Sequence, residues 1–226
     1  MKVILLGATG MVGQGVLREC LRDSRVTRVL TVGRQRTGLI DPRLTELVPP
    51  DLFDLTDVAD QLTGYDACFF CLGVSAAGLS EAAYRRLTYD LTLSIAGVLA
   101  SRNPGMTFTY VSGQGTDSTE HGRTMWARVK GATENALRRL PFKAVYLFQP
   151  GYIQPLDGIQ SKTRLYRAIY AVLGPAYPVM KALFPGAVTT TRAVGRAMIA
   201  LAIGQQPSKT LTNRDINAVA ASAASE

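Results

Sequence analysis

A glycine-rich segment near the start of the chain, Gly-Ala-Thr-Gly-Met-Val-Gly at residues 7–13, constrains the fold more than any other feature. It follows an apolar run at residues 3–6 and leads into an amphipathic stretch at residues 12–21. A strand that enters a loop of this kind, followed by a helix that leaves it, is typical of the first turn of a dinucleotide-binding fold.

Each glycine of this loop has a physical role in such a turn. Gly7 would make the tight turn, Gly10 would let the backbone approach a pyrophosphate, and Gly13 would allow the helix to pack closely on the strand. The phosphates would then meet free N–H groups and the positive end of the helix dipole. We therefore expect the cofactor to contact Gly7, Thr9, Gly10, Met11, Val12 and Gly13.

The rest of the first 150 residues alternates short apolar runs with longer amphipathic ones. The pattern predicts strands at 3–6, 26–32, 44–48, 67–72, 107–111 and 144–148, and helices at 12–21, 56–62, 80–100 and 124–139. Near-continuous apolar runs suit strands that are covered on both faces. The expected fold class is therefore α/β, a doubly wound parallel sheet of Rossmann type.

The pattern changes after Pro150. Helical stretches are predicted at 162–173, 177–183 and 193–203, with no further strong strand, and the Ala/Ser-rich end at 218–226 is expected to fray. We expect an NAD(P)-binding Rossmann-like domain at residues 1–153. Residues 154–226 would form a small, mainly helical C-terminal cap and tail, packed on the same domain at the carboxyl ends of the strands.

The end of the second predicted strand bears on which dinucleotide would bind. NAD-specific sites usually carry a carboxylate there, which accepts the ribose hydroxyls and would repel a 2′-phosphate. This chain has Gly33 and then Arg34 and Arg36, whose guanidinium groups match phosphate oxygens. The alternative is that both arginines are solvated loop residues. The sequence favours NADP (NADPH) as cofactor, with NAD less favoured.

Two further segments are candidates for the cofactor site. Asp54 and Leu55 follow the third predicted strand and could border the adenine pocket, although a helix N-cap explains Asp54 as well. Leu72, Gly73 and Val74 end the fourth strand, where Gly73 would let the ribose pass close to the backbone.

Composition narrows the classes of partner. The formal net charge is +8, but no run of five or six basic residues occurs and aromatic residues do not interleave with the basic ones, so no nucleic-acid partner is expected. No stretch reads as a transmembrane helix, and the chain starts without a charged leader, so the default expectation is a cytoplasmic protein without integral membrane association.

The cysteines do not form a recognisable redox or metal motif. Cys68 and Cys71 are spaced as a pair, but they fall in a predicted buried strand rather than near a helix start, and no second pair completes a zinc site. We interpret Cys20, Cys68 and Cys71 as core residues and expect no metal.

Five short segments carry a family resemblance: the glycine loop, Val-Gly-Arg at 32–34, Phe-Cys-Leu-Gly at 70–73, Tyr-Val-Ser-Gly at 110–113 and Lys-Gly-Ala-Thr-Glu at 130–134. In this order they resemble the atypical short-chain dehydrogenase/reductases. More narrowly, they are similar to the Tat-interacting-protein-like oxidoreductases and their bacterial "nucleoside-diphosphate-sugar epimerase" relatives. The resemblance covers residues 1 to about 153, and it implies the fold and the cofactor but little about the substrate.

The resemblance also implies roles for individual residues. Active relatives have a serine after the fifth strand and a Tyr-x-x-x-Lys pair on the next helix, in which the tyrosine donates a proton to the substrate carbonyl. Ser112 matches the serine and Lys130 matches the lysine that holds the nicotinamide ribose. The tyrosine position is occupied by Trp126, whose N–H cannot act as a general acid. In relatives the turn at Pro150, Gly151, Tyr152 and Ile153 runs past the nicotinamide.

No residue clearly replaces the missing proton donor. Tyr84, Tyr89, Tyr152 and the only histidine, His121, are each candidates, and none is favoured over a structural or solvated role. Trp126 itself fits either core packing or a wall of the substrate site.

Three functions therefore remain open. The first is an NADPH-binding oxidoreductase with an unknown small-molecule substrate and an altered proton donor. The second is a catalytically silent module that senses NADPH, which Trp126 favours. A sugar-nucleotide epimerase comes third, because epimerases rely on the tyrosine and usually carry a larger substrate domain. The expected assembly is a monomer or a homodimer.

Overall fold

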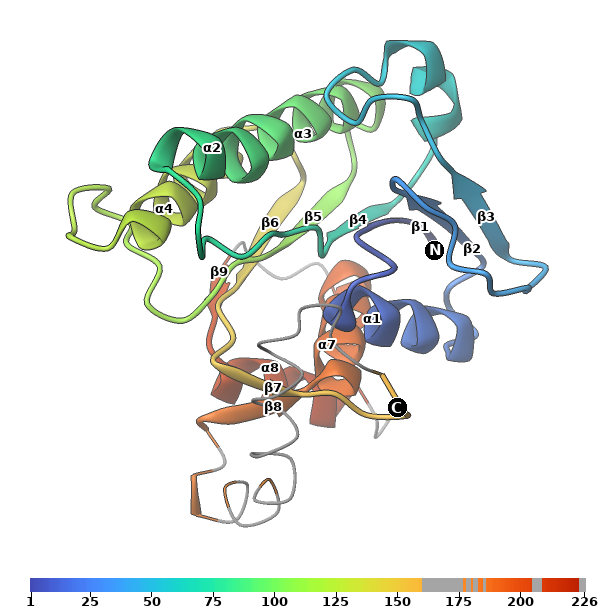
Figure 1. Ribbon diagram of the computed structural model, residues 1–226. Coiled ribbons are helices and arrows are strands. Elements are labelled where there is room, and N and C mark those ends of the chain that lie inside the picture. Colours follow the sequence, from blue (N-terminus) through green and yellow to red (C-terminus); the bar gives the residue numbers. More distant parts are fainter. Residues whose placement is uncertain (160–176, 178–179, 181–182, 185, 205–208, 224–226) are drawn as a thin grey trace.

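Seven parallel strands form one sheet in the order β3-β2-β1-β4-β5-β6-β9 (Figure 1). The computed structural model describes residues 1–159, 177, 180, 183–184, 186–204 and 209–223. The strands are β1 (Lys2–Leu6), β2 (Arg28–Val32), β3 (Leu44–Leu47), β4 (Ala67–Phe70), β5 (Thr107–Val111), β6 (Ala144–Phe148) and β9 (Lys209–Leu211). The strand order reverses between β1 and β4, which makes that point the topological switch where ligands bind in open α/β sheets.

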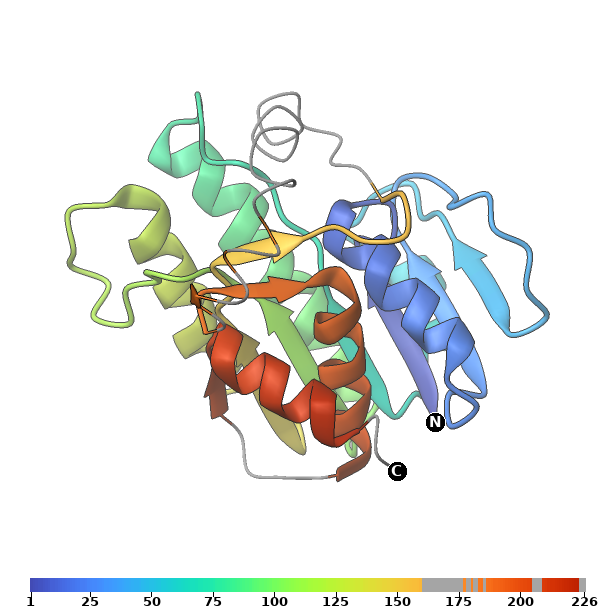
Figure 2. The same cartoon turned by 90° about the horizontal axis from the view of Figure 1, so that it is seen from below.

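Helices cover both faces of this sheet (Figures 1 and 2). One face carries α1 (Met11–Arg22), α7 (Thr191–Gly204) and α8 (Asn213–Ser222). The other carries η1 (Thr56–Leu62), α2 (Glu81–Arg85), η2 (Arg86–Asp90), α3 (Leu91–Arg102) and α4 (Met125–Leu137). The predicted fold class, a doubly wound parallel sheet of Rossmann type, is confirmed.

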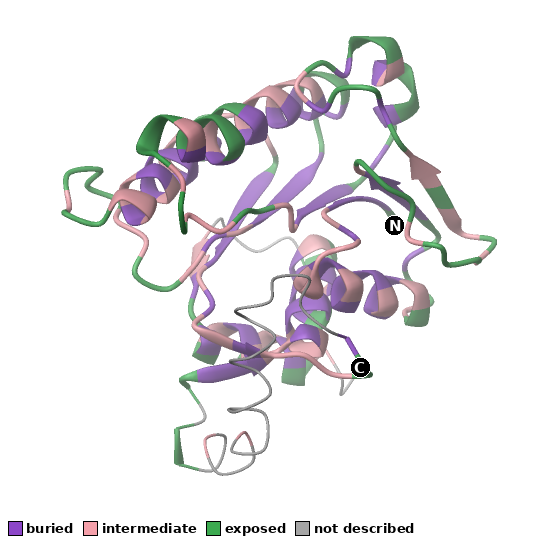
Figure 3. Ribbon diagram, in the orientation of Figure 1, coloured by how far each residue is buried: buried purple, intermediate pink, exposed green. Residues whose placement is uncertain are grey.

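Alternating side chains of each strand enter two separate cores. In β1, Val3 and Leu5 pack with α1 and α7, whereas Ile4 and Leu6 pack with η1 and α3. Successive side chains of a strand point to opposite faces, so a strand covered on both faces is apolar at most of its positions. Figure 3 shows the result, a sheet whose central strands are buried along their length.

Two glycines allow α1 and α7 to cross at close range. A Cβ added at Gly15 would lie 2.5 Å from Cβ of Thr191, and one added at Gly195 would lie 3.0 Å from Cβ of Glu19. The glycine loop is therefore followed by a further glycine that serves helix packing rather than ligand binding, and this packing holds α1 in place below the loop.

The six strands predicted before Pro150 are all present, with small shifts at their ends. The predicted helix at 80–100 is divided among α2, the π-helical turn η2 and α3, and the predicted helix at 56–62 is the 3-10 helix η1.

No strong strand was expected after Pro150, and the described residues there contain three short ones. A small second sheet pairs β7 (Tyr152–Gln154) with β8 (Val188–Thr190), and β9 adds a seventh strand beside β6. The described C-terminal residues therefore complete the sheet and one helical layer instead of only capping the strand ends. The helix predicted at 193–203 is α7, whereas the segments 162–173 and 177–183 lie wholly or partly outside the described residues.

The expectation of a frayed end from residue 218 is wrong as far as residue 222. Helix α8 runs to Ser222 and begins with a capping box, in which Thr212 accepts from the Asp215 N–H and the Asp215 carboxylate accepts from the Thr212 N–H. Such a box satisfies two amides that a helix start leaves without partners.

Candidate functional site

A cleft with a volume of about 870 Å³ opens at the switch point between β1 and β4. Its walls come from the carboxyl ends of β1, β2, β4, β5 and β6, from the starts of α1 and β7, and from α4. Parallel strands bring these segments to one edge of the sheet although they lie far apart in the sequence.

The glycine loop forms the floor of the cleft, and its geometry requires glycine. Gly7 has φ +79°, and a Cβ there would lie 2.6 Å from the backbone of Cys71 and Leu72. The Gly10 N–H donates to the Gly7 carbonyl at 2.9 Å and closes the turn. A Cβ on Gly13 would lie 2.0 Å from that same carbonyl oxygen, so Gly13 supports the loop from below.

Helix α1 begins at this loop with its first amides available. Gly10 is the N-cap residue, so no side chain caps the helix, and the first turn contains no acidic residue. The first amides of a helix have no acceptor within the helix, and with the helix dipole they favour an anion. Met11 and Val12 line the cleft at this point.

The rim beyond β2 carries a positive charge. Gly33, Arg34 and Gln35 line the cleft, and the Gly33 N–H donates to the Leu47 carbonyl at 3.2 Å. Arg34 is exposed, and no hydrogen bond or ion pair joins it to another described residue. Arg36 is also exposed but does not line the cleft.

Ser112, after β5, and Lys130, on α4, both line the cleft. The Ser112 hydroxyl lies 2.8 Å from the Thr116 hydroxyl, and its N–H donates to the Phe148 carbonyl at 2.7 Å. The Lys130 ammonium lies 5.9 Å from the centre of the Tyr110 ring. Burial lowers the pKa of Lys130 to about 8, against the opposing influence of the Glu134 carboxylate.

Trp126 lies one turn before Lys130 but is not among the residues that line the cleft. Its ring atoms Cζ3 and Cη2 lie 4.0 and 3.6 Å from the positions that a Cβ would take on Gly113 and Gly115. The indole therefore packs against the loop after β5, which favours packing over the interpretation as a wall of the substrate site.

The buried side chains of Glu134 and Asn213 hold the turn after β6. Gln149 donates from Nε2 to both carboxylate oxygens of Glu134, at 3.0 and 2.9 Å. The Gly151 N–H donates to Oδ1 of Asn213 at 3.2 Å, and Nδ2 of Asn213 donates to the Ala187 carbonyl at 2.6 Å. These bonds fix Pro150 and Gly151 where they border the cleft.

The structure brings most of the predicted site residues together. The predicted residues that line the cleft are Gly7, Thr9, Gly10, Met11, Val12, Gly33, Arg34, Leu72, Gly73, Val74, Ser112, Lys130, Pro150, Gly151 and Ile153.

Four other predicted residues lie elsewhere. Leu55 is buried in the core as the N-cap residue of η1, and exposed Asp54 accepts a hydrogen bond from the Thr56 N–H without capping the helix. The Tyr152 hydroxyl donates to Gln154 Oε1 at 2.7 Å, and Gly13 lies below the loop. The structure therefore does not place these residues in the lining.

Sequence reasoning missed seven lining residues. Most of them stand at the ends of predicted strands or in the turns directly after them, so strand ends were the signal that could have found them. They are Ala8, Thr31, Val32, Gln35, Cys71, Ser75 and Val111.

The cysteines are free, and one of them borders the cleft. Cys20 and Cys68 are buried, as interpreted, whereas Cys71 is partly buried: it packs against the core and also lines the cleft. Burial raises the pKa of the Cys71 thiol, so it is neutral near pH 7. Within the described residues, no cluster of three or more metal-ligating side chains occurs.

None of the alternative proton donors lines the cleft. Tyr84 is buried, Tyr89 lies under the guanidinium of Arg85 at 4.0 Å from its ring centre, and His121 is exposed. Lys130 and Ser112, in contrast, line the cleft and carry exchangeable protons.

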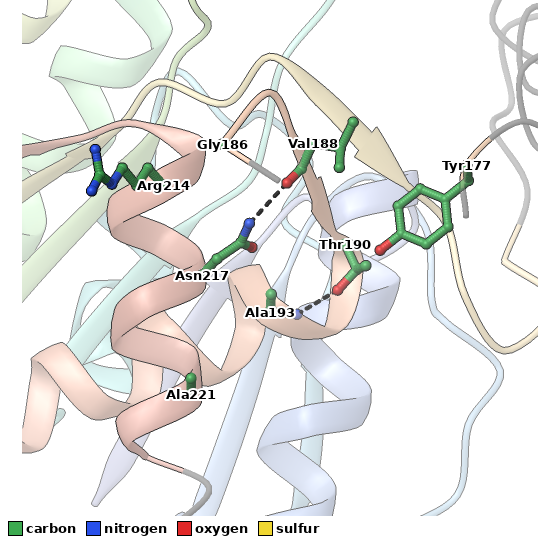
Figure 4. Close-up of a pocket in the computed structure, with 8 residues that line it drawn as sticks. All are labelled: Tyr177, Gly186, Val188, Thr190, Ala193, Arg214, Asn217 and Ala221. Carbon is green, nitrogen blue, oxygen red and sulfur yellow. Dashed lines mark hydrogen bonds between the residues drawn. The ribbon is translucent and has the colours of Figure 1, made fainter. Parts of the chain in front are cut away.

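A second cavity of about 710 Å³ lies away from this cleft, between β8 and α8 (Figure 4). Asn217 donates from Nδ2 to the Val188 carbonyl at 2.8 Å on its wall, and Tyr177 points toward Thr190. Arg214 stands at the opposite end from Tyr177. Its lining is Tyr177, Gly186, Val188, Thr190, Ala193, Arg214, Asn217 and Ala221.

No helix of the described residues is long and apolar enough to cross a membrane.

No protein-family model matches the chain, but individual proteins do. The chain is 30% identical over 159 residues to "Protein fmp52, mitochondrial" of Emericella nidulans, covering 67% of this chain and 66% of that protein. It is 26% identical over 153 residues to "Protein HTATIP2" of Rattus norvegicus, covering 67% of this chain and 62% of that protein. These matches therefore span less than two thirds of either relative.

Solved structures share the fold at low identity. The enzyme WbmH of Bordetella bronchiseptica, in complex with NAD⁺, superposes with a TM-score of 0.65 at 15% identity, over 93% of this chain and 75% of that one. At this identity the similarity shows the fold alone.

Proposed function

This chain belongs to the atypical short-chain dehydrogenase/reductases, with HTATIP2 and fmp52 among its homologues, and we propose on that premise that its cleft binds NADPH. The observation that carries the proposal is the cleft at the switch point, floored by the glycine loop and lined at its two ends by Arg34 and Lys130. Among the described residues that line it, none is acidic, so the cleft suits a ligand with several phosphates.

The residues present fit a dinucleotide. The surrounding backbone leaves no room for a Cβ at Gly7 and little room for one at Gly10. The start of α1 offers amides that no side chain caps. The pyrophosphate would bind to these amides, and the Gly33 and Gly73 backbones would border the two riboses. The structure of WbmH contains NAD⁺ in the same fold, which supports the assignment.

We propose NADPH rather than NADH on the chemistry of the rim. A carboxylate that would bind the ribose 2′-hydroxyl is missing from the described lining after β2, and Arg34 stands there instead. A guanidinium binds phosphate through two charge-assisted hydrogen bonds, which stabilises a 2′-phosphate more than a hydroxyl.

Within this binding function we propose an oxidoreductase in which Lys130 holds the nicotinamide ribose and Ser112 binds the substrate oxygen. Bound NADPH would supply a hydride to the substrate. The tyrosine that donates the proton in relatives is matched by Trp126, and the indole packs on the loop at Gly113 and Gly115. A different proton donor is therefore required, either Lys130 or a water molecule held by it.

The second candidate is a catalytically silent module that responds to bound NADPH. The position of Trp126 favours it, because an indole cannot donate a proton in the useful range. Loss of the donor would leave cofactor binding intact, since Trp126 is absent from the residues that line the cleft.

Two measurements test these proposals. NADPH emission sensitised by the single tryptophan, Trp126, would report binding in the cleft. Assays of NADPH consumption across aldehydes, ketones and quinones would then separate the two candidates. Turnover by the parent protein would eliminate the silent module, whereas turnover only after Trp126→Tyr would support it.

We propose that the protein acts in the cytoplasm as a monomer or homodimer, with a small-molecule substrate or none. The fmp52 relatives are named as mitochondrial, so cell fractionation with a marker for each compartment is the direct test. Recovery in the mitochondrial fraction would overturn this assignment.

A further inference from the structure

A short chain of hydrogen-bonded hydroxyl groups ends at the cleft. Ser112 follows β5, lines the cleft and is only 8% exposed. Its Oγ lies 2.8 Å from Oγ1 of Thr116, and that oxygen lies 2.7 Å from the Gly113 carbonyl oxygen. Thr116 is not among the residues that line the cleft, so any effect it has on a ligand passes through Ser112.

The direction of both hydrogen bonds follows from the number of hydrogens. A carbonyl oxygen only accepts, so the single hydroxyl hydrogen of Thr116 lies on the line to Gly113. The separation of 2.8 Å between the Ser112 and Thr116 oxygens is that of a hydrogen bond, and it requires a hydrogen between them. Since the hydrogen of Thr116 is already used, Ser112 is the donor.

This arrangement leaves the Ser112 oxygen as an acceptor at the cleft. A hydroxyl oxygen has two acceptor lone pairs, and its one hydrogen is held by Thr116. Within the described part of the chain, no hydrogen bond joins Ser112 Oγ to Lys130, which also lines the cleft. A hydroxyl that donates into a chain of hydrogen bonds is polarised and becomes a better acceptor itself.

The loop that carries Thr116 is held by its backbone. The Thr116 N–H donates to the Gly113 carbonyl at 3.1 Å, and the Asp117 N–H donates to the Ala127 carbonyl of α4 at 3.1 Å. These bonds do not involve the hydroxyl of Thr116. Removing that hydroxyl should therefore change what Ser112 donates to without displacing the loop.

We propose that Thr116 is a positioning residue that makes Ser112 a hydrogen-bond acceptor toward the cleft, so that the ligand group beside Ser112 is an alcohol O–H rather than a carbonyl oxygen. A carbonyl oxygen binds there only after Ser112 gives up its bond to Thr116. The cleft therefore prefers the alcohol of an alcohol–carbonyl pair, which forms when a carbonyl takes up a hydride and a proton. This ligand class rests on the proposed function, whereas the direction of the Ser112 hydrogen bond does not.

Neutron diffraction from deuterium-exchanged crystals of the full chain, grown without ligands, locates the hydroxyl deuterium atoms directly. We expect the deuterium of Ser112 on the line to Oγ1 of Thr116. In Thr116→Val it should leave this line and point into the cleft, and in Thr116→Ser it should stay on the line to the new hydroxyl. A Ser112 deuterium that points into the cleft in the parent protein would overturn the proposal.

The ligand class is tested with cyclohexanol and cyclohexanone, which differ only in the group that would meet Ser112. Their Kd values are measured by NMR titration of the full chain without cofactor, so that no turnover occurs. The ratio of the Kd for the ketone to the Kd for the alcohol should fall roughly three- to tenfold in Thr116→Val, as expected for one hydrogen bond. Thr116→Ser should retain the parent ratio.

Thr119→Val is the matched control, because it removes an exposed hydroxyl from the same loop, one that donates to Asp117. It should leave the ratio unchanged. A ratio that is the same in Thr116→Val and in the parent protein would overturn the proposal, and so would an equal fall in Thr119→Val. If the parent protein fails to bind NADPH while the neutron result holds, the proposed function is wrong and the direction of the Ser112 hydrogen bond stands.

Discussion

Oδ1 of Asn213 accepts a hydrogen bond from the Gly151 N–H at 3.2 Å, although the two residues lie 62 positions apart in the sequence. Asn213 is the first residue of α8 and is 3% exposed, and its Nδ2 also donates to the carbonyl of Ala187 before β8. One side chain thus joins the turn that borders the cofactor cleft to the strand that borders the second cavity. The C-terminal helix helps to shape the cleft without lining it.

Replacing Asn213 should loosen this junction. Asn213→Ala leaves the half-buried Gly151 N–H and the carbonyl of exposed Ala187 without their partner, and each lost hydrogen bond costs about 0.5–1.5 kcal/mol. The free energy of unfolding, measured by urea denaturation, should fall by at least that amount, and NADPH should bind more weakly. Asn135→Ala, at a half-buried asparagine whose side-chain hydrogen bonds lie at the surface, should change stability by less than about 0.5 kcal/mol. Equal losses in both variants would contradict the buried role of Asn213.

Arg34 should set the preference for NADPH over NADH. Arg34→Ala removes charge-assisted hydrogen bonds worth about 1.5–3 kcal/mol, so the Kd for NADPH should rise roughly tenfold or more while that for NADH stays near its parent value. Arg36→Ala is the matched control, because Arg36 is equally exposed but does not line the cleft. Calorimetric titration with each cofactor gives the ratio of the Kd for NADH to the Kd for NADPH. If Arg34→Ala left this ratio unchanged, the proposal that the cleft prefers NADPH would lose its basis.

The crossing of α1 and α7 should depend on Gly15. Gly15→Ala places a Cβ 2.5 Å from Cβ of Thr191 and 2.9 Å from its carbonyl oxygen, so the helices must separate at a cost of about 1–3 kcal/mol. Gly97→Ala in α3 meets nothing within 4 Å and should instead stabilise the helix by about 0.5–1 kcal/mol. Thermal unfolding followed by circular dichroism should give shifts of opposite sign. A Gly15→Ala protein as stable as the parent would show that the helices do not cross as described.

The charge of Lys130 should make NADPH binding depend on pH. Burial lowers the pKa of Lys130 to about 8, so the ammonium is present below that pH and is lost as the pH rises through it. The affinity for NADPH should therefore fall by roughly tenfold between pH 7 and pH 9.5, as expected for the loss of one charged contact. Lys130→Arg keeps its charge over this range and should flatten the curve. A parent curve that is already flat would show that Lys130 does not contact the cofactor through its charge.

The sequence predicted the parts of the fold that local chemistry decides. The apolar strands β1, β4 and β6 and the loop from Gly7 to Gly13 are contiguous in sequence, so pattern and composition were enough to place them. Strand β9 has only three residues, Lys209–Leu211, and becomes a strand because β6 offers it an open edge, which no local pattern reveals. The start of α8 was readable in principle, since Thr212 and Asp215 form a capping box.

The candidate site also contains residues that the sequence predicted and residues that it did not. Residues in the turns after strands, such as Gly33, Arg34 and Gly73, were predicted because parallel strands bring their ends to one edge. Leu55 lies in the core and outside the lining, and the sequence does not show on which side of a turn an apolar residue will lie. Glu134 and Asn213 were not singled out, because their roles come from contacts with distant residues after folding.

The most direct test of the central claim is a calorimetric titration of the purified full chain with NADPH and, separately, with NADH near pH 7. We predict one NADPH per chain, bound at least roughly tenfold more tightly than NADH, with the difference abolished by Arg34→Ala and retained by Arg36→Ala. An absence of binding for both cofactors, or a preference for NADH in the parent protein, would contradict the assignment of the cleft.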